Sequence, residues 1–111
     1  MLRISIKFKD SVIKTIETDS EKITIGRHEK NNIQIDNLAV SSLHARIIRE
    51  DDTYYIEDLD STNGTFLNDA QVKREQLKDT DAITIGKHTI VINIFPDRGG
   101  SVTDIDPTYA L

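Results

Sequence analysis

The sequence predicts an all-β fold, an antiparallel β-sandwich of many short strands. Apolar and polar residues alternate along many segments, which is the pattern of a strand with one buried face. Residues typical of turns separate these segments at short intervals. The segment whose composition comes nearest to that of a helix, residues 72–81, is short and charged. We therefore expect a loop with brief strand pairing there.

The first expected element is a β-hairpin. Leu2, Ile4, Ile6 and Phe8 fall on one side of its first strand, and a second alternating run at residues 12–18 follows a turn at residues 10–11. Further strands are expected at residues 22–25, 33–35, 43–49, 54–58, 65–67, 82–85 and 89–95, with turns at residues 29–32, 50–53, 61–64, 68–69 and 86–88.

The length of 111 residues, with 37% apolar residues, fits one domain with a modest core. The alternation stops at Pro96, and an acidic sequence with two adjacent glycines follows. We expect residues 1–95 to form the domain and residues 96–111 to form a flexible linker or tail.

The composition argues against several classes of protein. The chain has no cysteine, so it has neither disulfides nor thiolate metal ligands. No apolar stretch has the form of a secretory signal or a membrane span, so we expect a cytoplasmic protein without direct membrane contact. The net charge of −5 argues against nucleic-acid binding. Any bound anion must be held by local groups, because salt screens charges beyond about 8 Å.

Three polar clusters fall on expected loops: residues 26–27 (Gly-Arg), 41–44 (Ser-Ser-Leu-His) and 58–65 (Asp-Leu-Asp-Ser-Thr-Asn-Gly-Thr). Together they offer a guanidinium, several hydroxyls, an amide and turn backbone N–H groups. Arginine presents a planar set of donors that matches phosphate oxygens, and turn backbones form concavities that bind anions. These clusters therefore indicate a phosphate-binding site.

The same clusters, in this order, resemble the sequence pattern of the forkhead-associated (FHA) domain family. The matching segments are residues 23–27, 32–36, 40–45, 56–68 and 81–86. The resemblance spans about residues 2–95 and implies an FHA-like antiparallel β-sandwich of about eleven short strands, with its ligand loops at one end. It also implies a phosphothreonine-dependent peptide- or protein-binding module that acts as an adaptor in Ser/Thr kinase signalling. Such a module is not an enzyme and needs no cofactor or metal.

The resemblance implies five phosphopeptide-binding residues. Arg27 and Ser41 match the side chains that grip the phosphate, and Ser42 and Thr62 match neighbouring contacts. Asn63 matches the asparagine that holds the ligand main chain. Ser42 departs from the arginine or asparagine that many members carry.

Structural support for the site is expected from Gly26, His44 and Gly64. In the family, the glycine before the arginine and the histidine are mainly architectural, and the histidine braces the loops. Residues after the phosphothreonine are expected to be read by the loops at residues 38–40 and 68–74.

The alternative interpretation is a phospho-independent scaffold or assembly domain that uses the sandwich surface or a sheet edge. We expect a monomer unless Thr103 or Thr108 in the tail is phosphorylated, in which case a neighbouring molecule would capture it. Residues 58–69 match a calcium loop poorly, because the glycine falls one place late and Asp69 stands where such a loop has glutamate.

Overall fold

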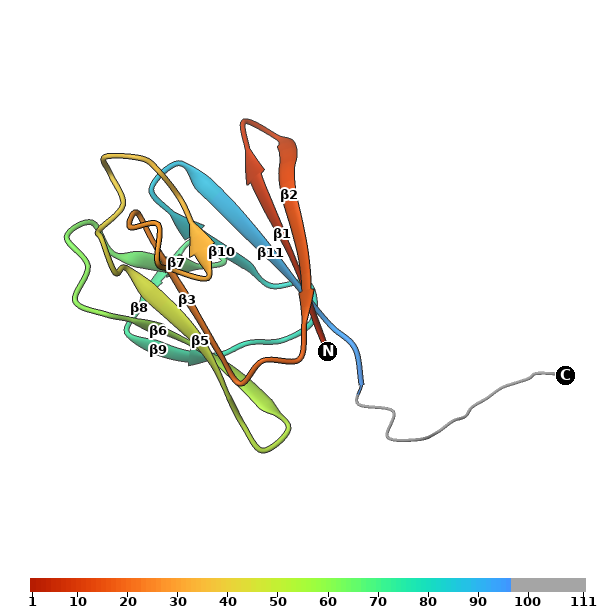
Figure 1. The fold of residues 1–111 in the computed structure, drawn as a ribbon. Helices are drawn as coiled ribbons and strands as arrows, with labels where there is room; N and C mark the ends of the chain where they lie inside the picture. Colours follow the sequence, from red (N-terminus) through yellow and green to blue (C-terminus); the bar gives the residue numbers. More distant parts are fainter. Residues whose placement is uncertain (97–111) are drawn as a thin grey trace, which may run out of the picture.

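The computed structural model describes residues 1–96, and Figure 1 shows them as strands and loops in two facing layers. No helix occurs among these residues. The eleven strands are β1 (Leu2–Phe8), β2 (Ser11–Thr18), β3 (Lys22–Gly26), β4 (Ile33–Gln34), β5 (Ala45–Glu50), β6 (Thr53–Asp58), β7 (Thr65–Leu67), β8 (Ala70–Val72), β9 (Arg74–Gln76), β10 (Ala82–Ile85) and β11 (His88–Ile94). The predicted β-sandwich is confirmed, and β9 provides the brief strand pairing expected within residues 72–81.

One layer is a six-stranded sheet in the order β2-β1-β11-β10-β7-β8, and the other is a five-stranded sheet in the order β4-β3-β5-β6-β9. Neighbouring strands are antiparallel except β3 and β4, which pair in parallel with Ile25 opposite Ile33. This exception to the predicted antiparallel arrangement arises because the loop of residues 27–32 carries the chain back beside β3. Ile33 can then enter the core next to Ile25.

The alternating apolar and polar residues of the sequence point to opposite faces of the strands. In β1, Leu2, Ile4 and Ile6 point into the space between the sheets, where each is at most 2% exposed. Complete burial of such a side chain contributes about 1.5–3 kcal/mol. The core formed in this way is rich in isoleucine and contains Leu2, Ile4, Ile6, Ile23, Ile25, Ile33, Ile35, Val40, Ala45, Ile47, Tyr54, Ile56, Leu67, Leu77, Ile83, Ile85, Ile90 and Ile92.

The two sides of the sandwich differ. On one side, Lys73 alone connects β8, at the edge of the first sheet, to β9, at the edge of the second. On the other side, the edge strands are β2 and β4, and a hollow of about 220 Å³ lies between them. The sandwich is therefore closed by the chain on one side and open on the other.

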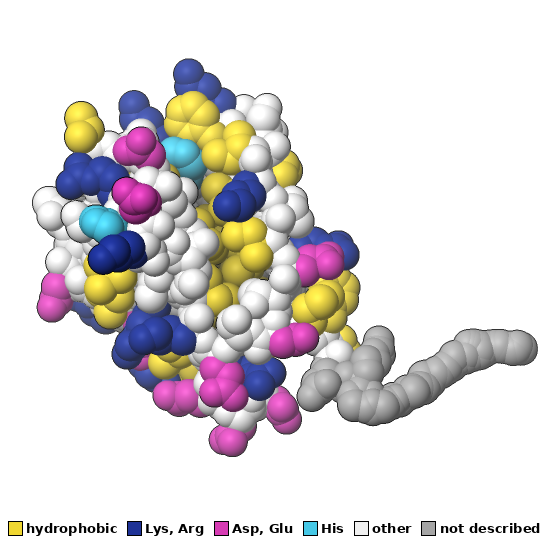
Figure 2. All heavy atoms as spheres, viewed as in Figure 1, with side chains coloured by type: hydrophobic (Ala, Val, Ile, Leu, Met, Phe, Trp, Pro, Cys, Tyr) yellow, Lys and Arg dark blue, Asp and Glu magenta, His cyan; other side chains and the backbone are white. Residues whose placement is uncertain are grey.

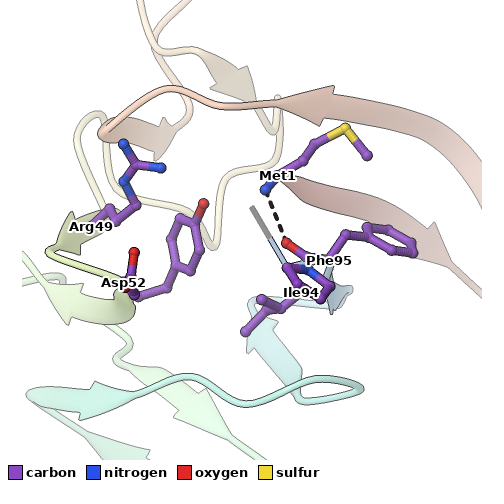
Figure 3. Close-up of a pocket in the computed structure, with 7 residues that line it drawn as sticks. Met1, Arg49, Asp52, Ile94 and Phe95 are labelled. Atoms are coloured by element: carbon purple, nitrogen blue, oxygen red, sulfur yellow. Dashed lines mark hydrogen bonds between the residues drawn. The ribbon is translucent and has the colours of Figure 1, made fainter. Parts of the chain in front are cut away.

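The two ends of the described chain lie together. The ammonium group of Met1 donates a hydrogen bond to the carbonyl of Phe95 at 3.1 Å, which is the dashed line in Figure 3. The same ammonium group lies 3.3 Å from the Asp19 carboxylate, just after β2. No helix of the described residues has the length and apolar character needed to cross a membrane.

The strand predicted at residues 43–49 begins later than expected, at Ala45. Leu43 is half exposed, and the backbone N–H of His44 donates to the Ile25 carbonyl outside the regular ladder. These two residues therefore belong to a loop, which lies at the end of the molecule described next.

Candidate functional site

The three polar clusters meet at one end of the sandwich. Residues 26–27 end β3, residues 41–44 precede β5, and residues 59–64 join β6 to β7. A hollow of about 120 Å³ opens between them, lined by Arg27, Leu38, Ala39, Val40, Ser41, Thr62 and Asn63. Four of the five residues expected to bind a phosphopeptide thus share one hollow, and Ser42 is not among those that line it.

Backbone hydrogen bonds hold Arg27 beside Ser41. The Arg27 N–H donates to the Ser41 carbonyl at 2.9 Å, and the His28 N–H donates to the Ser42 carbonyl at 3.2 Å. The Asn31 side-chain amide also donates to the Ser42 carbonyl, at 2.7 Å. The backbone of Ser42 therefore fixes the loop, while its side chain is exposed.

Gly26 allows this close approach. A Cβ atom at position 26 would lie 2.3 Å from the Ser42 carbonyl oxygen and 2.9 Å from its carbonyl carbon. Because both atoms belong to the backbone, neither could move aside without moving the loop. A glycine is therefore required at position 26 for steric reasons.

Ser41 is oriented by the loop that contains Thr62. The Ser41 Oγ accepts a hydrogen bond from the Thr62 N–H at 3.0 Å. A hydroxyl that accepts in this way keeps its own hydrogen available. The Ser41 hydroxyl can therefore donate to an anion in the hollow.

His44 connects two of the loops from a position with no solvent exposure. Its Nδ1 accepts a hydrogen bond from the Ser41 N–H at 3.0 Å, so the proton of the neutral ring is on Nε2. The Nε2 then donates to the Gly64 carbonyl at 2.9 Å. Gly64 has a positive φ of 90°, which favours glycine at this turn.

Asp58 supports the third loop and was missed as a supporting residue by the sequence analysis. Its carboxylate accepts hydrogen bonds from the hydroxyls of Ser61 and Thr65 and from the Ser61 N–H. Its side chain is only 2% exposed. Burial acts to raise the pKa of this carboxyl, but the hydroxyls, the Ser61 N–H and the nearby Lys73 outweigh it and lower the pKa. An Asp three residues before a Ser is a turn signal that could have indicated this role.

Arg27 and Asn63 keep binding groups available. Within residues 1–96, the Arg27 guanidinium makes no ion pair or side-chain hydrogen bond. The Asn63 amide nitrogen donates to the Ala39 carbonyl at 2.8 Å, and this bond fixes the side chain. The Asn63 Oδ1 accepts no hydrogen bond from the described residues, so it can accept one from a ligand N–H. The hollow can thus hold an oxyanion and a peptide group next to it.

A larger hollow of about 300 Å³ contains none of the predicted site residues. It is lined by Met1, Arg49, Asp52, Tyr54, Ile94, Phe95 and Pro96 and is shown in Figure 3. It lies at the opposite end of β5 from the polar loops, and its Arg49 is 3.5 Å from the Glu21 carboxylate. Because carboxylates already lie near this arginine, the hollow is less suited to a phosphate than the one at Arg27.

Comparisons with known proteins point to one family. Residues 23–86 match the family model of the FHA domain. The oxoglutarate dehydrogenase inhibitor of Corynebacterium diphtheriae is 36% identical over 73 residues, which are 66% of this chain and 51% of that protein. The glycogen accumulation regulator GarA of Mycobacterium tuberculosis is 32% identical over 81 residues, which are 73% of this chain and 50% of that protein. The chain thus spans about half the length of these relatives.

A solved structure from work on phosphothreonine-dependent FHA domain interactions superposes on this chain with a TM-score of 0.75. It is 29% identical in sequence, and the match covers 85% of this chain and 98% of the other.

We expect Gly26→Ala to destabilise the domain by about 1–3 kcal/mol, because the added methyl group would meet the backbone of Ser42. Ser42→Ala is the matched control, because it keeps that backbone and removes only an exposed hydroxyl, and it should change stability by no more than about 0.5 kcal/mol. Urea unfolding of the two variants measures the difference. Equal stability of the two variants would contradict the close approach.

We expect the stability of the domain to depend on the charge of Asp58 in acid. Its pKa is lowered in the folded state, so its contribution is present above the unfolded-state pKa of about 3.9 and is lost as the pH falls through the folded-state pKa. Urea unfolding between pH 2.5 and 6 should show this loss, and Asp58→Asn should flatten the curve. The pH dependence of stability that remains in Asp58→Asn should come in part from Glu57, whose pKa is lowered mainly by its hydrogen bond with Arg46. An unchanged curve in Asp58→Asn would contradict the prediction.

Proposed function

Because this chain belongs to the FHA domain family, we propose that it binds phosphothreonine-containing segments of other proteins and acts as an adaptor in Ser/Thr kinase signalling. The observation that carries this proposal is the shared hollow of Arg27 and Ser41. The Arg27 guanidinium has no ion-pair or hydrogen-bond partner among the described residues. The Ser41 hydroxyl accepts from the Thr62 N–H, which leaves its own hydrogen free to be donated. A doubly charged phosphate satisfies both groups at once.

The phosphate would be held mainly by Arg27 and Ser41, with Thr62 at the edge of the same hollow. The Thr62 N–H is already engaged by Ser41, so its hydroxyl is the group available to the ligand. Ser42 lies outside the lining, and we assign its exposed hydroxyl a minor contact with the ligand.

Asn63 would accept a hydrogen bond from the ligand main chain through its Oδ1, since its amide nitrogen is held by the Ala39 carbonyl. Ala39 and Val40 form the apolar part of the hollow and offer a contact for the threonine methyl group. Leu38, which is 90% exposed beside the hollow, is positioned to contact residues that follow the phosphothreonine.

We propose that the chain is a binding module without catalytic activity, a monomer, and not a nucleic-acid-binding protein. The relatives are named as an inhibitor and a regulator. The geometry also disfavours Ser41 and His44 as a nucleophile and its base. The His44 Nδ1 accepts from the Ser41 backbone N–H, and the Ser41 Oγ is bonded to the Thr62 N–H.

A second candidate function is phospho-independent assembly through a sheet edge. It is favoured by β2, an edge strand on which Val12 and Ile13 are each more than half exposed. Replacing Arg27 and Ser41 together distinguishes the two functions, because a complex formed through the edge would persist.

Thr103 and Thr108 lie outside the described residues. If either is phosphorylated, we propose that the hollow of a neighbouring molecule captures it. Light scattering of the phosphorylated and unphosphorylated chain should then show a larger mass for the former, and an unchanged mass would contradict capture.

We predict that Arg27→Ala lowers the affinity for a phosphothreonine peptide by about 10- to 100-fold, because each charged hydrogen bond contributes about 1.5–3 kcal/mol. The fold should survive, since the Arg27 side chain makes no ion pair with the described residues. Fluorescence anisotropy measures the affinity. Arg3→Ala is the control, because Arg3 is partly exposed and paired with Glu17 away from the site, and it should bind like the unchanged protein. Equal binding of phosphorylated and unphosphorylated peptides would reject the proposed function.

We predict that a phosphoserine peptide binds more weakly than its phosphothreonine counterpart, by no more than about 1–3 kcal/mol, because a single methyl group in an apolar contact discriminates only to that extent. The same anisotropy titration, with peptides that differ only at this residue, tests it. Tighter binding of the phosphoserine peptide would contradict a role for the apolar wall.

A further inference from the structure

The strand β2 is a long edge. It has eight residues, whereas β8, β4 and β9, which end the sheets elsewhere, have two or three. Among the described residues, β2 pairs only with β1, so the N–H and C=O groups along its other side have no ladder partner. Proteins usually cover or shorten such an edge, because it can pair with another chain.

An apolar groove runs beside this edge. Its hollow of about 220 Å³ is lined by Ile16, Thr18 and Ser20 from β2 and the turn after it, by Ile23 and Ile33 from the other sheet, and by Asn32 just before β4. Figure 2 shows hydrophobic side chains in the groove between the two layers. An extended segment placed along β2 could pair with its backbone and bury an apolar side chain in the groove.

The register of the β1–β2 ladder shows which β2 side chains lie on the inner face of the sheet, the face from which Ile16 lines the groove. Ile16 pairs with the buried Ile4, and Lys14 pairs with the buried Ile6, so both point to the inner face. Thr15 pairs with Ser5 on the outer face. Lys14 is exposed and forms no ion pair within residues 1–96.

The described part of the chain ends near the end of β2. Leu2 lies between Ile94 of β11 and Thr18 of β2, so these two strands end at the same end of the sheet. A chain that continues from Phe95 and turns back along the edge would therefore run antiparallel to β2. A strand added beyond β2 would lie three strand spacings from β11, because β1 and β2 come between them, and this distance is about 14 Å. Five residues can span up to about 17 Å, so residue 101 can reach it.

We propose that residues 101–105 dock on the free edge of β2 as a seventh strand of this sheet. In this register, Val102 lies opposite Ile16, Asp104 lies opposite Lys14 and Thr103 lies opposite Thr15. Val102 adds an apolar side chain to the groove, Asp104 meets the unpaired ammonium group, and the two threonines form a cross-strand pair on the outer face. Each of these pairings is favourable in a sheet.

The two matches on the inner face make this register specific. Residues two apart in a strand share a face, and only the spacing of Val102 and Asp104 fits that of Ile16 and Lys14 while the chain runs antiparallel. Ile105 would come next to Ile13, which lies at an irregularity of the ladder and is more than half exposed. A docked strand would cover this residue too.

Docking within the chain is favoured over docking of a separate molecule. A short connection gives the segment an effective concentration in the millimolar range at its own edge. A second copy pairing antiparallel about Thr15 would place Lys14 opposite Ile16 and Ile13 opposite Glu17, which offers neither charge pairing nor a second apolar contact in the groove. The segment thus complements the edge better than a second copy does.

Engineered disulfides test the proposal in the full chain, which has no cysteine of its own. Thr15→Cys with Thr103→Cys places two thiols opposite each other in the proposed register, at a separation that a disulfide can bridge. The control combines Thr103→Cys with Asp52→Cys. Asp52 and Pro96 line the same hollow, so a segment that moves at random reaches Asp52 at least as readily as Thr15.

Equilibration with glutathione gives the effective concentration of each thiol pair. We expect a value at least about tenfold higher for the Thr15 pair than for the Asp52 pair, with a disulfide that is intramolecular and independent of protein concentration. Equal values, or a disulfide that joins two molecules, would overturn the proposal. Binding of a phosphothreonine peptide checks that each variant is folded, and its failure would bear on the proposed function separately.

A charge exchange tests the register independently. In the Thr15 and Thr103 cysteine background, Lys14→Glu should lower the effective concentration about two- to fivefold, as expected for an exposed ion pair. Adding Asp104→Lys should restore it. If the second substitution lowers it further, Lys14 and Asp104 are not neighbours and the proposed register is wrong.

Discussion

A single buried imidazole joins the loops that form the candidate site. His44 accepts from the Ser41 N–H and donates to the Gly64 carbonyl, so it links the loop of Ser41 to a turn twenty positions after His44 itself. The bond to Gly64 is buried and the bond from Ser41 is partly buried, so loss of either would leave a polar atom of the buried ring without its partner. The positions of Ser41 and of the turn at Gly64 therefore depend on one side chain that does not line the hollow.

The hollow is consequently a property of the loops acting together. Gly26 allows β3 to approach the Ser42 backbone, and Asp58 holds the turn that carries Thr62 and Asn63. Rigid positioning of this kind lowers the entropy that a ligand must lose to bind. It also explains how a chain with a net charge of −5 can offer a site for an anion, since one oriented guanidinium and nearby N–H and O–H groups act at short range.

The architecture separates this site from the rest of the surface. The three polar loops lie at one end of the strands, while the first and last described residues lie at the other, next to the hollow of Figure 3. The open side of the sandwich, between β2 and β4, lies along the strands and not at the ligand loops. A contact on the β2 edge is thus compatible with a ligand held at Arg27, and one chain can use both surfaces at the same time.

The sequence by itself determined the strands and the nature of the site, because both can be inferred from short stretches of residues. Alternation at Leu2, Ile4 and Ile6 predicts a half-buried strand wherever the strand lies, and the ordered motifs identify the polar loops. Only the tertiary structure decided that β3 and β4 are parallel, that β5 begins at Ala45, that Ser42 lies outside the hollow and that Asp58 holds a loop. These features depend on hydrogen bonds and close contacts between residues far apart in the chain. The pairing of the strands sets the distances between such residues, and short local patterns in the sequence carry no information about them.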